Sequence, residues 1–214
     1  MCRQNILYIG KKRRVQDAED LGVLVHESQK TSMQVQQIIK KVNGMLAFIA
    51  KGIEYKGKEV LLQLHKALVR PHLEYCAQFW SPYLRKDVVA LEAVQRRFTR
   101  LIPEVRGLSY EERLNSLGRH SLEFTRMRRD QIEVYKMIKD MDKVDVERML
   151  PLVGHCRTRS HSLRIRGSKF KIELRRNYFS QRVVNLWNLL PLSVVDAGTL
   201  SKFKEELDFL VVMG

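Results

Sequence analysis

Residues 31–52 read TSMQVQQIIKKVNGMLAFIAKG and carry the clearest structural signal in the chain. Their apolar residues recur at intervals of three and one, which is the spacing of one face of an α-helix. The residues on that face are Val35, Ile38, Ile39, Val42, Met45, Leu46 and Ile49. Thr31 and Gln34 fit a capping box at the start of this helix, and Gly52 fits its end. The stretch therefore predicts an amphipathic helix.

The same kind of apolar spacing continues beyond this helix and predicts further ones. They are expected at about 57–76, 85–102, 109–117 and 121–141. Proline at position 71 removes one backbone hydrogen bond, so a kink or a break is expected at Arg70-Pro71. Ser109 and Glu112 fit a second capping box. The arginines expected on the exposed face of the last of these helices are Arg126, Arg128 and Arg129.

The pattern changes after Asp142. The segment Arg157–Leu174 alternates between apolar and basic side chains, and Gly167-Ser168 divides SLRIR from KFKIEL. An alternating segment with a central glycine predicts a β-hairpin. Two helices are expected to close the chain, at about 179–190 and 200–211.

Two short strands are expected near the N-terminus, at Ile6–Ile9 and Leu21–Val25. The predicted fold class is therefore mainly α, a helical bundle followed by a small basic β-hairpin and two C-terminal helices. A soft boundary near residues 142–156 separates the predicted bundle from the predicted hairpin and tail.

Composition favours a folded protein with a sizeable core. Hydrophobic residues make up 44% of the 214 positions and charged residues 29%, a balance that argues against wholesale disorder. No apolar run approaches the roughly 18–20 residues that cross a bilayer. The N-terminus has its short apolar stretch before the basic cluster, which is the reverse of a secretory signal. We therefore expect a soluble intracellular protein, nuclear or cytoplasmic, with no membrane partner.

The formal net charge of +15 is unevenly distributed along the chain. Between Arg157 and Arg182 there are nine basic residues and one acid, Glu173, so this segment supplies eight of the fifteen excess charges. Such an excess attracts polyanions, although a charged run is also typical of a merely solvated face. The candidate phosphate contacts are Arg157, Arg159, Arg164, Arg166, Lys169, Lys171, Arg175 and Arg176.

The spacing of four of these arginines strengthens the nucleic-acid hypothesis. On a strand, residues two apart share a face, so Arg157 would align with Arg159, and Arg164 with Arg166. A guanidinium matches a phosphate with two hydrogen bonds, and a row of them suits successive phosphates.

The sequence predicts no metal site and no cofactor. Cys2, Cys76 and Cys156 are widely spaced and odd in number, which argues against a disulfide framework and a structural zinc site. The acidic cluster DMDKVDVE at 140–147 lacks the glycine and terminal glutamate offsets of a calcium loop. The helical spacing of Tyr75 and Phe79 favours the core over base stacking. Trp187 lies in an apolar stripe and is also expected in the core.

Four blocks resemble a known family. LVRPHLEYCAQFWSPY from Leu68, LEAVQRRFTRLIP, RTRSHSLRIRG and YFSQRVVNLWNLLP resemble, in this order, the C-terminal part of reverse transcriptases encoded by non-LTR retrotransposons. The chicken-repeat clade of these long interspersed elements is most similar. The resemblance implies that residues 1–30 are the end of a polymerase palm. It further implies a helical thumb at 31–141 and a post-thumb extension at 142–214.

The resemblance also implies a function, because the thumb of this family grips the template–primer duplex. The implied phosphate contacts in the helix at 85–102 are Arg96, Arg97 and Arg100, which lie off its apolar stripe, with Arg96 and Arg100 sharing a face. The family's polymerases carry catalytic carboxylates in an Asp-Asp block. No two aspartates are adjacent in these 214 residues, so no enzyme activity is expected.

The expected function is that of a catalytically incomplete, truncated fragment of a retrotransposon RNA-directed DNA polymerase. It would bind RNA, DNA or an RNA–DNA hybrid through the phosphate backbone, without sequence specificity. One alternative is a decayed transposon-derived fragment with no selected function, acting at most as a protein-interaction domain. Another is a polymerase component whose palm is supplied by a partner chain.

Overall fold

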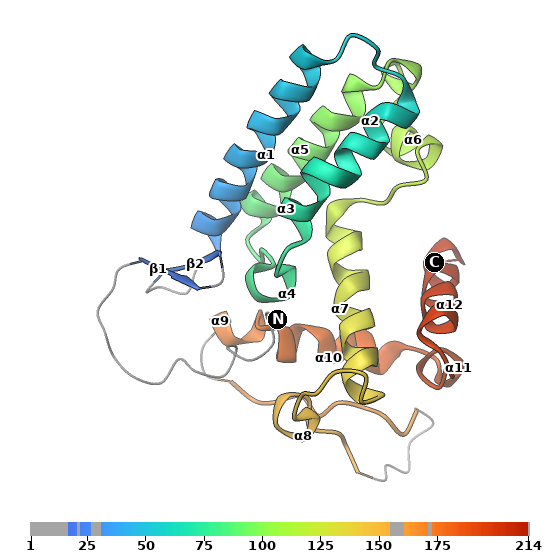
Figure 1. Ribbon diagram of the computed structural model, residues 1–214. Coiled ribbons are helices and arrows are strands. Elements are labelled where there is room, and N and C mark those ends of the chain that lie inside the picture. The colour runs from blue at the N-terminus through green and yellow to red at the C-terminus, as the bar shows by residue number, and fades with distance from the viewer. Residues whose placement is uncertain (1–16, 21, 27–30, 155–160, 171–172, 214) are drawn as a thin grey trace. The chain divides into compact units, whose positions relative to one another are not determined.

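The chain is mainly α-helical and divides into two compact units, residues 1–126 and 127–214 (Figure 1). The computed structural model describes most of it, namely residues 17–20, 22–26, 31–154, 161–170 and 173–213. Each unit has its own hydrophobic core. No helix within these described ranges is long and apolar enough to cross a membrane.

Unit 1 begins with two short antiparallel strands, β1 (Asp17–Asp20) and β2 (Val23–His26). The reversal between them includes Gly22, whose φ of +77° is costly for residues with a Cβ atom. The second strand overlaps the strand predicted at Leu21–Val25. The one predicted at Ile6–Ile9 lies outside the described residues.

Helix α1 (Ser32–Gly52) follows, with nearly the predicted bounds. The capping box predicted for its start is wrong, because Thr31 has a helical backbone and its hydroxyl makes no capping hydrogen bond. A capping side chain reaches the first amides when its own backbone is extended. The Ser32 hydroxyl instead donates to the Asp87 carboxylate at 2.5 Å, joining the start of α1 to that of α5.

The disruption predicted at Arg70-Pro71 takes the form of a π-helical turn. Helix α2 (Lys58–Leu64) continues directly into this turn at His65–Val69, and α3 (Arg70–Glu74) follows. Because Pro71 has no backbone N–H, a regular α-helical ladder cannot continue through it. The wider π turn accommodates that interruption while the chain keeps its direction.

The remaining helices of unit 1 are short except for α5. They are α4 (Ala77–Trp80), α5 (Arg85–Leu101), a 3-10 turn at Pro103–Val105 and α6 (Tyr110–Ser116). The capping box predicted at the start of α6 is confirmed. Glu112 N–H donates to the Ser109 hydroxyl at 3.3 Å, and Ser109 N–H donates to the Glu112 carboxylate at 2.8 Å.

Helix α7 (Leu122–Ile138) starts in unit 1 and continues into unit 2. Its first amide is capped by a carboxylate distant in sequence, because Leu122 N–H donates to the buried Glu92 at 3.0 Å. The Tyr110 hydroxyl donates to the same carboxylate. Glu92 thus accepts hydrogen bonds from two elements and offsets the cost of its own burial.

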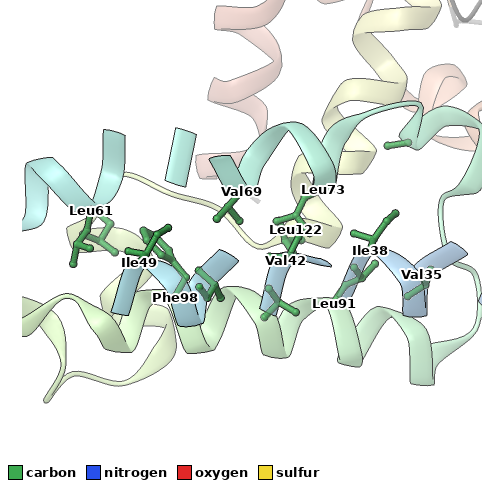
Figure 2. Packing of buried hydrophobic residues seen from close by; sticks show 14 of the residues in the cluster. Val35, Ile38, Val42, Ile49, Leu61, Val69, Leu73, Leu91, Phe98 and Leu122 are labelled. Atoms are coloured by element: carbon green, nitrogen blue, oxygen red, sulfur yellow. The ribbon is translucent and has the colours of Figure 1, made fainter. Parts of the chain in front are cut away.

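The core of unit 1 lies between α1, α5 and the α2–α3 segment. Figure 2 shows side chains of these helices, together with Leu122 at the start of α7, pointing toward one another. The labelled ones are Val35, Ile38, Val42, Ile49, Leu61, Val69, Leu73, Leu91, Phe98 and Leu122. The stripes predicted for the helices at 31–52 and 85–102 supply this core, so the one-sided helical pattern is confirmed.

The described residues of unit 2 form the rest of α7 and five further helices. They are α8 (Val146–Met149), α9 (Glu173–Arg176), α10 (Phe179–Leu189), α11 (Leu192–Val195) and α12 (Leu200–Met213). The core surrounds Trp187, which is fully buried as predicted. Tyr135 stacks on Phe203 with ring centroids 4.3 Å apart, and its hydroxyl donates to the Ala197 carbonyl.

The hairpin predicted at Arg157–Leu174 is wrong. Within it, the described residues 161–170 contain no strand, and Leu174 belongs to helix α9. These described residues take part in an isolated antiparallel bridge, between Ile165 and Leu152. The backbone of this segment is paired instead with side chains of α10 and with the backbone of residues 151–153.

The exposure predicted for Arg126, Arg128 and Arg129 is wrong as well. Arg126 is buried, and Arg128 and Arg129 are half-buried. The Arg128 guanidinium donates to the Asp208 carboxylate on α12 at 2.7 Å. Helix α7 buries residues on more than one face, so a single apolar stripe underestimates how much of its circumference is covered.

His65 is the least well satisfied polar side chain in the core of unit 1. It is 5% exposed, its ring lies 4.1 Å from that of Phe98, and neither ring nitrogen has a hydrogen-bond partner among the described residues. Burial, together with the smaller effects of the Arg119 and Arg70 charges, lowers its pKa from 6.5 to about 4. The imidazole is therefore neutral and unpaired at neutral pH.

We expect the His65→Leu variant to be more stable than the parent at pH 7, by about 1 kcal/mol or more, because two unpaired buried nitrogens are removed. The parent should lose up to about 3 kcal/mol as pH falls from 6.5 to 4, since the unfolded chain binds the proton first. The variant should lack that loss. Urea unfolding at several pH values measures both effects. Equal pH dependence in parent and variant would contradict the assignment, and His120→Gln, at an exposed histidine, is the control.

Candidate nucleic-acid interface

The segment at residues 161–170 is held against helix α10 by side chains of that helix. The Trp187 indole N–H donates to the Leu163 carbonyl at 2.8 Å. The Asn188 side-chain amide accepts from Ile165 N–H and donates to the Ile165 carbonyl, both at 2.9 Å. These bonds satisfy the backbone of this segment as a neighbouring strand would.

Farther along the segment, the contacts move toward the N-terminal end of α10. A Cβ atom at Gly167 would lie 3.7 Å from a methyl group of Val184. Ser168 N–H donates to the Gln181 side-chain carbonyl at 3.2 Å. Because its contacts pass from Asn188 to Gln181, the segment runs back along α10 and brings Ser168 to the first turn of this helix.

Four basic residues of this region are exposed to solvent, and we call them the basic surface. They are Arg166, Lys169, Arg175 and Arg176. The first two belong to the segment along α10, and the other two belong to α9, which ends shortly before α10 begins. All four are among the predicted phosphate contacts.

The other predicted contacts of this region differ from one another. Arg164 is half-buried, whereas Arg166 is exposed, so the two side chains do not form the predicted row of exposed arginines. The backbone explains their position, because Val153 N–H donates to the Arg164 carbonyl and Arg166 N–H donates to the Pro151 carbonyl. Predicted contacts outside the described residues are Arg157, Arg159 and Lys171.

Arg182, one of the nine basic residues of this region, has a structural partner. Its guanidinium binds the Asp130 carboxylate of α7 through two hydrogen bonds, of 2.8 and 3.0 Å. The side chains of the two residues are 19% and 10% exposed. This charge is neutralised inside unit 2, and the sequence pattern gave no means of separating it from the exposed ones.

In unit 1, the three arginines of α5 are exposed but point in different directions. The Arg96 guanidinium lies 4.9 Å from the centre of the Tyr110 ring, over α6. The Arg97 side chain donates to the Asn43 side-chain carbonyl of α1 at 2.7 Å. Arg100 is exposed at the last turn of α5. Arg96 is therefore directed toward α6 and Arg97 toward α1, and all three stay predicted phosphate contacts.

The core placement predicted for Tyr75 and Phe79 is wrong, because both are exposed. Cys76 between them has a φ of +49°, so α3 ends and α4 begins there, and the helical spacing does not continue across it. Cys76 itself is half-buried and disulfide-bonded, contrary to the prediction against disulfides. No cluster of three potential metal-ligating side chains occurs in the described part of the chain.

Two exposed aromatic residues beside the basic surface were missed by sequence reasoning. Phe170 follows Lys169 and is 36% exposed, and Tyr178 precedes α10 and is 43% exposed. The sequence carried a signal for both, since KFK and RRNY place an aromatic ring among cations. The predicted hairpin drew attention to the arginines alone.

No protein-family model, curated protein or solved structure matches this chain. The resemblance to retrotransposon polymerases therefore has the four quoted sequence blocks as its support.

The Asp130–Arg182 pair yields a test of which basic residues are structural. Asp130→Asn should lower the free energy of unfolding by about 3 kcal/mol, because it leaves a half-buried guanidinium without its charge partner. Glu123→Gln breaks the exposed pair with Arg85 and should cost less than about 0.5 kcal/mol. Denaturant unfolding measures both. If the two variants lose equal stability, the Asp130–Arg182 pair does not hold α10 to α7.

Proposed function

We propose that this chain binds nucleic acid through its phosphate backbone, without sequence specificity. The observation that carries the proposal is the basic surface, whose residues Arg166, Lys169, Arg175 and Arg176 are each exposed, on the segment that packs against α10 and on α9. Like charges held close together repel one another, and a polyanion relieves that repulsion while releasing its condensed counterions. The net charge of +15 favours the same class of partner.

The absence of sequence specificity follows from the kind of side chains on this surface. Arginine and lysine heads bind phosphate oxygens, which are the same at every nucleotide. Sequence-specific proteins commonly insert a helix or a β-ribbon into the major groove. Here the exposed cations belong to a non-helical segment and to α9, a helix of four residues, which is too short to follow a groove.

We further propose that the chain derives from a retrotransposon RNA-directed DNA polymerase and is catalytically incomplete. The four quoted blocks support the origin. The lack of adjacent aspartates in these 214 residues supports the absence of polymerisation, since two-metal phosphoryl transfer needs carboxylates that converge on one point. A polymerase partner supplying the palm would restore that chemistry in trans.

A second candidate function is protein interaction, and one observation favours it. Unit 2 exposes large apolar side chains on three helices, Leu189 on α10, Leu192 on α11 and Phe209 on α12. Exposed apolar residues that gather into a patch mark interaction sites. The two functions are separated by salt, because phosphate binding weakens steeply with ionic strength and apolar association does not.

Replacing the four residues of the basic surface with glutamine should weaken binding to all nucleic-acid sequences alike. The slope of log K against log salt should become shallower by up to about four units, because each phosphate neutralised on B-form DNA contributes about −0.9. Fluorescence anisotropy with labelled duplexes of two unrelated sequences, at several salt concentrations, measures affinity and slope together.

The matched control removes the same charge from exposed positions of unit 1, namely Lys51, Lys66, Lys86 and Arg106. It should leave the affinity closer to that of the parent. If both quadruple variants weaken binding equally, net charge explains the result and the basic surface is not a site. If the parent shows no salt-dependent binding, the proposed function is wrong.

The purified chain should not extend a primer on an RNA template with Mg²⁺ or Mn²⁺, because no carboxylate pair is present to hold two metal ions. Nucleotide incorporation on a denaturing gel is the readout, with a complete reverse transcriptase as positive control. Incorporation that co-purifies with the chain through several columns would contradict the prediction. Incorporation only after addition of a separate palm-containing protein would favour a two-chain polymerase.

A further inference from the structure

We infer that the basic surface binds single-stranded nucleic acid in preference to duplex, with Phe170 and Tyr178 stacking on unpaired bases. This inference rests on the proposed function and adds the class of nucleic acid to it. It depends on where the chain places two aromatic rings relative to four cations.

The course of the segment along α10 brings these residues to one end of the helix. Its backbone contacts run from Asn188 to Gln181, so Phe170, two residues beyond the Ser168–Gln181 hydrogen bond, lies near the first turn of α10. Tyr178 is the residue at which that helix begins. Both aromatic residues therefore lie toward the N-terminal end of α10, with seven residues between them in the chain.

The cations of the basic surface flank both rings along the chain. Lys169 immediately precedes Phe170, and Arg175 and Arg176 lie just before Tyr178. Backbone hydrogen bonds fix this second group, since Tyr178 N–H donates to the Arg175 carbonyl at 3.2 Å. Aromatic rings among cations give a strand two kinds of contact, stacking for its bases and ion pairing for its phosphates.

Both rings keep a substantial part of their surface in water, 36% for Phe170 and 43% for Tyr178. The core of unit 2 already contains Tyr135, Trp187 and Phe203, so these two exposed rings are additional to its packing. A solvent-exposed ring loses apolar contact with water when a base covers it.

Unpaired bases fit this arrangement better than paired ones. In a duplex each base is already stacked on its neighbours and has no free face for a protein ring. A single strand offers a base face and a phosphate at every nucleotide, and stacking on aromatic side chains accepts any base. An acidic protein segment would satisfy the cations but would bring no planar base to the rings.

The exposed aromatic residues of unit 1 provide a matched comparison. Phe48 and Tyr55 are 71% and 75% exposed, more than the pair beside the basic surface. Phe48 has no charged neighbour in the chain, and Tyr55 lies between Glu54 and Lys56, whose charges offset each other. A double substitution there removes the same two ring types without touching the basic surface.

The experiment measures binding of the whole chain to a labelled oligothymidylate of about 16 nucleotides and to a duplex of equal length, at one salt concentration. Phe170→Ala with Tyr178→Ala should weaken single-strand binding about five- to a hundredfold for each ring that stacks. Duplex binding should change by less than about twofold, because phosphate contacts dominate there. Phe170→Tyr with Tyr178→Phe keeps both rings and should bind as the parent does.

The control pair, Phe48→Ala with Tyr55→Ala, should leave both affinities unchanged, and thermal unfolding shows whether each variant is folded. The inference is wrong if the parent binds duplex as tightly as single strand, or if the ring-deleted variant keeps single-strand affinity. Equal competition by polyglutamate and by unlabelled oligothymidylate, at matched charge, would show an acidic partner and would also overturn it. Loss of all nucleic-acid binding by the parent would instead overturn the proposed function.

Discussion

The backbone of residues 163–168 must find hydrogen-bond partners, and α10 and the backbone of residues 151–153 supply them. The Asn188 amide alone satisfies both polar backbone groups of Ile165, and the Trp187 indole takes the Leu163 carbonyl. An unpaired backbone group in such a position would cost about as much as a lost hydrogen bond. The side chains of one helix thus fix the course of a segment that has no regular structure of its own, and the exposed cations follow from that course.

The basic side chains of unit 2 fall into two groups. Some pair with carboxylates of the same unit, and others are exposed to solvent. Arg182 joins α10 to α7 through Asp130, and Arg128 joins α7 to α12 through Asp208. These pairs connect helices that also share the core around Trp187. Arg166 and Lys169 are exposed on the segment those helices support. Because these helices pack around one core, they set the backbone positions of the exposed cations before a polyanion binds. This lowers the entropic cost of ordering those cations on binding.

The sequence predicted the helices better than it predicted the site. The stripes of α1 and α5 are one-sided and long, so the 3.6-residue period left few alternatives. The alternating pattern after Asp142 led to the wrong prediction of a hairpin. A segment that packs against a helix can also alternate between apolar and basic side chains. Spacing also failed for Tyr75 and Phe79, where one left-handed residue, Cys76, ends the helix that the spacing assumed.

Counting charges located the basic region, but it could not separate the exposed basic residues from those that are half-buried or paired. Arg164 and Arg182 have the same residue type and local composition as Arg166, yet the first is half-buried and the second is paired. What sets Arg182 apart is contact with a residue far away in sequence, Asp130. Phe170 and Tyr178 were within reach of sequence reasoning, because they stand beside cations in the chain.

The π-helical turn at His65–Val69 determines the sequence spacing of the residues that face the core. The residues that face the core are Leu61, His65, Val69 and Leu73, spaced by four throughout. On a regular α-helix a strict four-residue repeat drifts around the axis by about 40° at each step. The wider turn reduces that drift, so the repeat stays on one face. The π turn is the geometry that one additional residue produces within an α-helix. His65, whose ring nitrogens have no hydrogen-bond partner among the described residues, is the first residue of this turn.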